Sequence, residues 1–169
     1  MDIYAICTLL PTDAPAFRDF RLGALRNAPQ AFGSTYEAES TKALSFFQER
    51  LHTNTVLAAR ANGTIVGTAG LAANTGAREK HKGFIWGVFV APRARGQGVA
   101  NALLTALLAH ADQHYEQVVL TVTADNLPAL TLYQHAGFEI YGREPRSLKD
   151  GKDYSDEILM IRFAPQPAS

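Results

Sequence analysis

The chain has 169 residues, of which 47% are hydrophobic and 19% are charged, a composition typical of a globular fold and not of a disordered chain. This length suits one ordinary domain, and we expect residues 1–163 to form it, with 164–169 as a loose tail. Sixteen Lys and Arg balance sixteen Asp and Glu, so the basic excess of a typical nucleic-acid-binding protein is absent.

Cysteine usage and the lack of long apolar stretches bear on the compartment. Cys7 is the single cysteine, so no intramolecular disulfide can form. The first residues lack a basic leader, and no apolar run approaches the roughly 18–20 residues of a membrane span. We therefore expect a cytoplasmic protein with no membrane or nucleic-acid partner.

The first third of the chain predicts a strand and two helices. Residues 2–10 are rich in strand formers and are stopped by a proline. Apolar residues then recur at helical spacing in two segments, which predicts a helix capped by Thr12 or Asp13 and a second helix over about 41–52. The Pro, Gly and Ser content of residues 27–35 between them is typical of a loop.

A hairpin and a buried strand are expected next. Two strand-like runs, 55–61 and 64–72, are separated by Asn-Gly at 62–63, the strongest short hairpin signal. After a polar connection, residues 83–90 are almost all apolar or aromatic, as in a strand that is covered on both faces. Gly87 within this strand indicates a bulge or a close backbone approach.

The second half predicts helix, strand, helix and a final hairpin. A long helix carries a complete apolar stripe: Ala100, Leu103, Leu104, Leu107, Leu108 and Ala111. Residues 117–123 form a buried strand, and Asp125 or Asn126 can cap a short helix that ends before Gly137. Two last strands, 138–148 and 154–163, flank a hairpin-type turn.

This order of elements, β-α-α-β-β-β-α-β-α-β-β, predicts a single α+β (mixed α/β) domain. Its central sheet should have about seven strands, mostly antiparallel, and be flanked by four helices. The strands joined by the long helix, 83–90 and 117–123, should be parallel and connected right-handedly.

Residues 88–100 combine a buried strand, a glycine-rich loop and a helix start. Unpaired N–H groups at a helix N-terminus and the positive end of its dipole attract phosphate. Gly96 and Gly98 leave room for a pyrophosphate beside the backbone, and Arg93 and Arg95 add positive charge. The alternative is that the glycines only form a tight turn and that the arginines are ordinary surface residues.

Two other phosphate-binding motifs do not match this loop. A P-loop needs Gly-Lys-Ser/Thr after its glycine-rich stretch, and no such residues follow here. A dinucleotide fingerprint needs a third glycine where this chain has Asn101.

Two segments together resemble the GNAT N-acetyltransferase superfamily. Arg95-x-x-Gly98-x-Ala100 is similar to its first signature. The second segment, similar to Asn-x-x-Ala-x-x-Leu-Tyr-x-x-x-Gly-Phe, comprises Asn126, Ala129, Leu132, Tyr133, Gly137 and Phe138. The resemblance covers most of the chain and is strongest between residues 84 and 141. It implies an acyltransferase that moves an acetyl group from acetyl-CoA to a primary amine by direct attack in a ternary complex.

The resemblance also implies the cofactor contacts. The pantetheine of CoA would lie between two splayed parallel strands, 84–90 and 117–123, held by backbone groups of Val88 and Val90. The loop amides would hold the pyrophosphate. The implied cofactor-binding residues are Val88, Phe89, Val90, Arg95, Gly96, Gln97, Gly98, Val99, Ala100, Asn101, Asn126 and Tyr133.

By the same resemblance, Tyr133 would be the catalytic acid that protonates the departing thiolate. Read from spacing alone, Tyr133 shares one helical face with apolar residues and could instead be a core tyrosine with a satisfied hydroxyl. Asn126 would contact the cofactor or a neighbouring strand, or cap the helix, and these roles are compatible.

The sequence departs from better-understood members at the general base. No carboxylate stands in residues 84–87, and Glu37, Glu39, His81 and Asp156 are low-ranking candidates that are more typical of solvated surface residues. A CoA-binding sensor without catalysis is therefore one alternative. A transferase of a different acyl chain is another, which the shape of the thioester pocket would decide.

Two further expectations concern metals and assembly. His110 and His114 are spaced i, i+4 but lack a third ligand, so we expect no metal. The final hairpin offers an edge strand through which a homodimer could form. The acceptor amine, whether a small molecule or a protein, is not specified.

Overall fold

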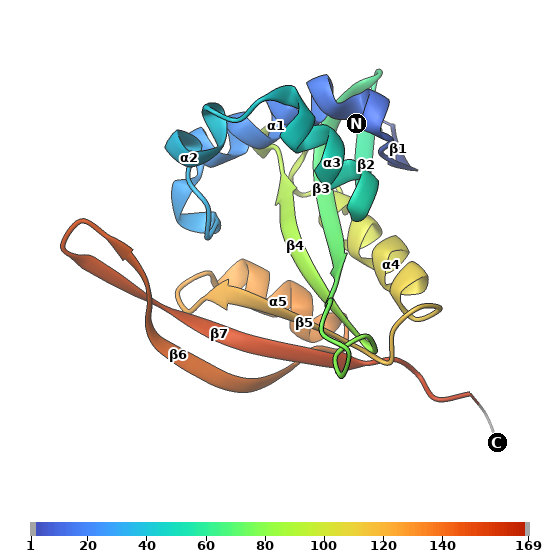
Figure 1. Cartoon of the computed structure of the whole chain (residues 1–169), viewed down its shortest axis with the longest axis vertical. Coiled ribbons are helices and arrows are strands. Elements are labelled where there is room, and N and C mark those ends of the chain that lie inside the picture. Colours follow the sequence, from blue (N-terminus) through green and yellow to red (C-terminus); the bar gives the residue numbers. More distant parts are fainter. Residues whose placement is uncertain (1–2, 168–169) are drawn as a thin grey trace. The chain divides into compact units, whose positions relative to one another are not determined.

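The computed structural model describes residues 3–167. The strands are β1 (Tyr4–Thr8), β2 (Thr55–Ala61), β3 (Thr64–Ala73), β4 (Lys82–Val90), β5 (Gln117–Thr123), β6 (Glu139–Asp150) and β7 (Asp153–Phe163). The helices are α1 (Ala14–Asn27), α2 (Tyr36–Ser40), α3 (Leu44–Thr53), α4 (Val99–Ala111) and α5 (Leu127–His135) (Figure 1). Three 3₁₀ turns, η1 (Pro11–Asp13), η2 (Pro29–Ala31) and η3 (Pro92–Ala94), precede or link them.

The strands form a seven-stranded mixed sheet in the order β1-β2-β3-β4-β5-β7-β6. β1–β2, β2–β3, β5–β7 and β6–β7 are antiparallel. β4 and β5 are parallel, with Lys82–Phe84 opposite Gln117–Val119. The predicted α+β class and the parallel strand–helix–strand crossover are therefore confirmed.

One helix was not expected. α2 begins directly after the predicted loop, because the Thr35 side chain accepts a hydrogen bond from Ala38 N at 3.1 Å and caps its first turn. We expected four flanking helices, and the described residues form five α-helices. α3 begins at Leu44, three residues later than predicted, because α2 and the turn after it occupy the start of that range.

The predicted cap of α1 is also different. Asp13 precedes the helix, but its side chain makes no cap hydrogen bond to α1. The chain enters α1 through the turn η1, so the Asp13 carboxylate reaches back to Leu10 N at 2.8 Å and pairs with Arg60 at 2.9 Å. Asp13 therefore joins the start of η1 to strand β2.

Contacts divide the chain into two units, which we describe separately. The first comprises residues 3–72 and 85–109. One apolar cluster in this unit joins α1, α3, β2 and β3, and consists of Leu9, Ala14, Phe17, Phe47, Leu51, Val56, Ala58 and Ile65. On β3, the space beside Gly67 is filled by Leu103 and Val99 of α4, about 3 Å from where a Cβ would stand. The apolar stripe predicted for α4 is buried from Leu103 to Ala111, and only Ala100 is partly exposed.

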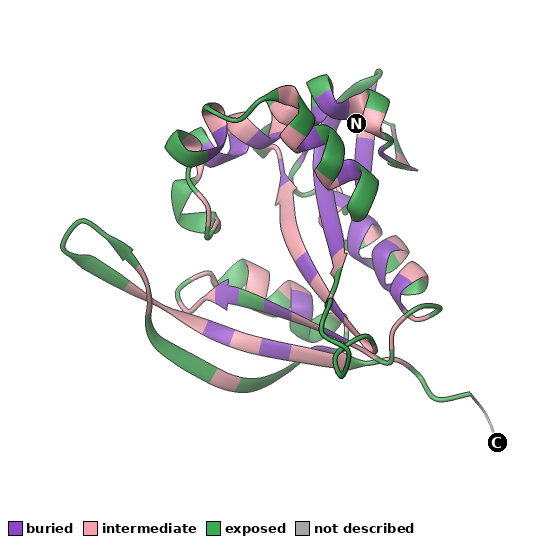
Figure 2. Ribbon diagram, viewed as in Figure 1, coloured by how far each residue is buried: buried purple, intermediate pink, exposed green. Residues whose placement is uncertain are grey.

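The second unit comprises residues 73–84 and 110–167. Buried residues alternate with less buried ones along parts of β5 and β7 (Figure 2), because successive strand residues point to opposite faces. Arg162 of β7 donates from Nη1 and Nη2 to the two carboxylate oxygens of Asp112, at 2.7 and 3.1 Å. The β6–β7 hairpin turns at Gly151, which has a φ of +59°.

The two ends of the chain contribute no further helix or strand among the described residues. β7 ends at Phe163, and the assignment of residues 1–163 as one catalytic domain stays a prediction. Residue 1, residue 2 of the first predicted strand and residues 168–169 of the predicted tail lie outside the described residues. Within residues 3–167, no helix has both the length and the apolar character to cross a membrane.

Candidate cofactor loop and active-site residues

The loop after β4 places two glycines in the left-handed region. Gly96 has a φ of +76° and Gly98 a φ of +77°, which residues with a side chain adopt only at a cost. No atom lies within 4 Å of a Cβ built at Gly96, and the nearest at Gly98 is Tyr4 Oη at 3.8 Å. The backbone conformation, and not crowding within the protein, therefore requires these two glycines.

This conformation leaves a row of backbone amides without a partner. The first amide of the α4 region that donates to a backbone carbonyl is Ala102 N, which binds Gly98 O at 3.0 Å. Among the described residues, the N–H groups of 96–101 donate no hydrogen bond. Six successive free amides at the N-terminus of a 13-residue helix form a strong anion-binding surface. The loop is therefore suited to bind an anion such as a phosphate.

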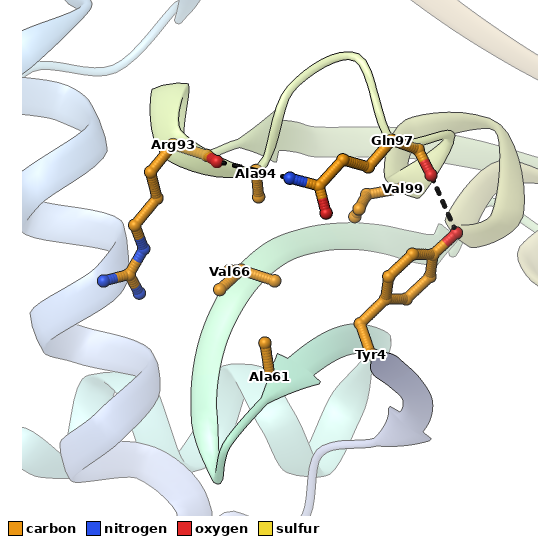
Figure 3. Close-up of a pocket in the computed structure, with 7 residues that line it drawn as sticks. All are labelled: Tyr4, Ala61, Val66, Arg93, Ala94, Gln97 and Val99. Carbon is orange, nitrogen blue, oxygen red and sulfur yellow. Dashed lines mark hydrogen bonds between the residues drawn. The ribbon is translucent and has the colours of Figure 1, made fainter. Parts of the chain in front are cut away.

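The arginines of the loop behave differently from each other. Arg95 Nε donates to Val90 O at 3.1 Å, and its guanidinium lies 5.4 Å from the centre of the Phe89 ring. Arg95 thus ties the loop back to β4. Arg93 is exposed, and its side chain points away from Gln97 (Figure 3).

A small pocket supports the loop from below. Its lining comprises Tyr4, Ala61, Val66, Arg93, Ala94, Gln97 and Val99 (Figure 3). Tyr4 Oη donates to Gln97 O at 3.4 Å, and the Gln97 amide reaches Arg93 O at 3.5 Å. These contacts hold Gln97 between the two glycines and so maintain the exposed amides.

Strand β4 is irregular at the predicted position. Gly87 has a φ of +64°, and its carbonyl accepts a hydrogen bond from Thr68 Oγ1 at 3.0 Å. A Cβ at Gly87 would lie 3.4 Å from Nη1 of Arg21. The glycine thus allows both a left-handed backbone and the close approach of a buried guanidinium.

Tyr133 lies on α5 and is 7% exposed. Its ring packs edge-on against Phe138, with the centroids 5.8 Å apart, and burial raises the pKa of its hydroxyl well above the ordinary value. Among residues 3–167, no group forms a hydrogen bond with this hydroxyl. The hydroxyl is also not fully enclosed, because Arg18 Nε is the one fully enclosed side-chain N or O in that range that lacks a partner. The Tyr133 hydroxyl therefore keeps some contact with solvent, unlike a core tyrosine with a satisfied hydroxyl.

Asn126 caps α5, since its side-chain oxygen accepts a hydrogen bond from Ala129 N at 3.3 Å. The cap leaves the side-chain amide nitrogen of Asn126 without a partner within the described chain. Of the predicted cofactor residues, Val88 to Asn101 are contiguous in the first unit, whereas Asn126 and Tyr133 belong to the second.

One candidate for the general base, Glu39, lies in a different environment from the one predicted. Glu39 is not a solvated surface residue: it is 3% exposed and binds Arg21 at 2.9 Å and Arg50 at 3.4 Å. Burial by itself raises the pKa of Glu39, but hydrogen bonds from Arg21 and Ser34 and the charges of both arginines outweigh it and hold the pKa below its ordinary value. Sequence reasoning missed this cluster because its members are spread over 30 residues, although an Arg within the apolar face of α1 is a signal for it.

Asp156 is no better as a base. The backbone N–H of Arg146 and the side chain of Arg143 bind its carboxylate, and these hydrogen bonds lower the pKa of Asp156. His110 and His114 stack with their ring centres 4.4 Å apart, and burial, aided by His114, lowers the pKa of His110. No group of three or more potential metal ligands stands together in residues 3–167.

Known proteins share this fold. An acetyltransferase of the GNAT family from Streptococcus pneumoniae superposes with a TM-score of 0.84 at 23% identity, covering 95% of this chain and 99% of that one. A putative acetyltransferase from Salmonella typhimurium, solved with acetyl-CoA, superposes with a TM-score of 0.81 at 17% identity, covering 99% and 97%.

Curated relatives match over shorter segments. The L-amino acid N-acetyltransferase AaaT of Escherichia coli is 33% identical over 79 residues, 46% of this chain and 49% of that protein. The mycothiol acetyltransferase of Saccharomonospora viridis is 45% identical over 58 residues, 34% of this chain and 19% of that protein. The matches thus span half or less of these relatives.

The sequence pattern of the acetyltransferase (GNAT) family matches residues 22–138, which include the glycine loop, α4, β5 and Tyr133. This match extends over well more than half of the chain and over both motif segments, so the chain belongs to the GNAT family of acetyltransferases.

Proposed function

We propose that the protein is an acetyl-CoA-dependent N-acetyltransferase that transfers the acetyl group to a primary amine by direct attack in a ternary complex. The observation that supports this most is the row of free amides at residues 96–101, in a chain that belongs to an acetyltransferase family. When bound, acetyl-CoA supplies the acetyl group as a reactive thioester.

The loop residues would bind the cofactor. Amides of Gly96 to Asn101 would donate to the diphosphate, and Arg93, which is exposed beside them, would add charge. Val88, Phe89 and Val90 would offer backbone groups to the pantetheine, and Asn126 would offer its free side-chain N–H groups. An N–H on β4 near the left-handed Gly87 would stabilise negative charge on a carbonyl oxygen.

Tyr133 would hold a proton for the departing sulfur. The hydroxyl is protonated at neutral pH and has no competing partner among the described residues. Burial raises its pKa further, so the departing sulfur must lie close to it for the proton to be transferred. Substitution Tyr133→Phe should lower kcat by roughly 10²-fold and leave CoA affinity unchanged. Because no hydrogen bond is lost and the ring still packs on Phe138, Tm should also stay unchanged. Wild-type turnover in this variant, with chemistry rate-limiting, would exclude the acid role.

Proton removal from the acceptor would not depend on Glu39 or Asp156. Arginines hold both carboxylates in the charged form, so neither accepts a proton readily near pH 7. We propose that water takes this proton. The kcat/KM values for two acceptors whose amine pKa values differ should then give pH profiles displaced by that difference, whereas a fixed enzyme base would give a common inflection.

The direct test is thiol release from acetyl-CoA in the presence of a panel of amines. Turnover with acetylated product, identified by mass spectrometry, supports the transferase. CoA binding by calorimetry without turnover on any amine would favour the sensor, and turnover with a longer acyl-CoA alone would change the donor.

A further inference from the structure

The buried guanidinium of Arg21 is only partly used by the protein. Nε and Nη2 of Arg21 bind the two carboxylate oxygens of Glu39 at 3.1 and 2.9 Å. The guanidinium also lies 5.1 Å from the Phe32 ring centre and 5.5 Å from that of Trp86. These contacts fix the position of the guanidinium, and the hydrogen bonds to Glu39 do not use Nη1.

Nη1 of Arg21 is a free donor beside strand β4. No described residue accepts a hydrogen bond from it, and it is not an enclosed atom, because Arg18 Nε is the sole enclosed nitrogen or oxygen without a partner in residues 3–167. Only 8% of Arg21 is exposed, so this small accessible part includes Nη1. Gly87, which has no side chain to cover it, lies next to Nη1.

The cluster also carries one surplus positive charge. Within residues 3–167, Glu39 is the single carboxylate bound by Arg21 and Arg50, so two cations face one anion. Arg50 is half-buried, 4.9 Å from the Trp86 ring centre and 4.7 Å from that of Phe46. Burial lowers the pKa of Arg50, which reflects the cost of removing its charge from water. A further anion would offset this cost.

Aromatic contacts link this cluster to the cofactor loop within the first unit. Arg95 lies over Phe89, Phe89 packs on Phe32 with centroids 5.5 Å apart, and Phe32 lies over Arg21. The surplus charge, carried by α1 and α3, therefore lies beside Gly87 of β4, the strand that also carries the proposed pantetheine contacts at residues 88–90.

We propose that Arg21 Nη1 and Arg50 bind the carboxylate of the acceptor, which makes the acceptor class the α-amino acids. This inference rests on the proposed transferase function. A carboxylate adjacent to the amine would satisfy the free donor and neutralise the cluster. Polyamines and simple alkylamines would meet a like charge, and protein N-termini lack the carboxylate.

The first test compares acceptors that differ only in the carboxylate. Methionine, phenylalanine and leucine are each assayed beside their carboxamide and their decarboxylated amine. We expect kcat/KM for at least one amino acid to exceed that of both analogues by about tenfold or more, the value of one charge-assisted hydrogen bond. Equal use of the carboxamides would overturn the inference and leave the transferase intact.

A binding measurement decides the case even without turnover. Trp86 is the single tryptophan and contacts both arginines, so its fluorescence reports on the cluster. Titration of the CoA-bound protein with the same compounds should change the emission for the amino acid at a concentration at least tenfold lower than for its amide. Absence of any such difference would contradict carboxylate binding, whatever the activity.

Variants assign the effect to the cluster. Arg50→Gln removes the surplus charge but keeps the Arg21–Glu39 pair, and Arg21→Lys keeps the charge but removes Nη1. Each should reduce the preference for the carboxylate to threefold or less. The control is Arg26→Gln. Arg26 lies on the same helix as Arg21, α1, but it is exposed and contacts Tyr36, so this substitution should leave the preference for the carboxylate unchanged. A full preference in a folded Arg50→Gln protein would argue against the assignment.

Discussion

Substitution Gly98→Ala tests whether the left-handed backbone of the loop creates the proposed phosphate site. Gly98 has a φ of +77°, and a Cβ there would meet no atom closer than Tyr4 Oη at 3.8 Å. Steric clash therefore contributes nothing, and the cost is that of the left-handed conformation, about 1–2 kcal/mol.

This cost can appear in either of two measurements. If the loop keeps its conformation, the free energy of unfolding falls by about 1–2 kcal/mol, and Tm falls by roughly 2–4 °C per kcal/mol in a domain of this size. If the loop relaxes, residues 98–101 no longer present their amides together, and Kd for CoA rises by about 5- to 30-fold. Calorimetric titration with CoA and thermal unfolding with and without CoA distinguish the two.

Gly63→Ala is the matched control. Gly63 also has a φ of +77° and no atom within 4 Å of its Cβ position, but it lies in the β2–β3 turn. This variant should lose similar stability without any change in the Kd for CoA. The reasoning is refuted if Gly98→Ala keeps both its Tm and its affinity, or if Gly63→Ala weakens CoA binding equally.

Three further substitutions test the first unit. Gly70→Ala would place a Cβ 2.5 Å from the ring of Trp86, so it should destabilise the fold by about 1–3 kcal/mol and shift Trp86 emission; an unchanged Tm would disprove this packing. Gly23→Ala, within α1 and with no atom in reach, should instead raise stability by up to about 1 kcal/mol, and a loss would contradict the open space. Glu39→Gln should cost about 3–5 kcal/mol at pH 7 because it leaves Arg21 buried without its anion. Since folding lowers the pKa of Glu39, the wild-type advantage should be complete above about pH 5 and vanish as the pH falls through the folded value; an equal advantage at pH 2.5, measured by urea unfolding, would contradict the ion pair.

Most elements could be predicted because their signals are local. The Asn-Gly hairpin forms with φ values of +50° and +77° at Asn62 and Gly63, since both residues tolerate that region. Strand β5 has the predicted bounds, and α4 buries its apolar stripe from Leu103 onward. Local signals failed where a turn preceded a helix. The carboxylate of Asp13 serves the turn η1 and not the helix α1, and Thr35 starts a helix too short for apolar periodicity to indicate.

The chemistry separates in the same way. The sequence by itself determined the glycine loop, its arginines and the family resemblance, because a helix N-terminus and its free amides are made by consecutive residues. It could not determine the partners of Glu39, since Arg21 and Arg50 reach that carboxylate only after α1, α2 and α3 have packed together. Only the tertiary structure decided that the Glu39 carboxylate pairs with two arginines and that one donor of Arg21 stays free beside Gly87. The physical reason is that charge compensation depends on distances between helices and not on spacing along the chain.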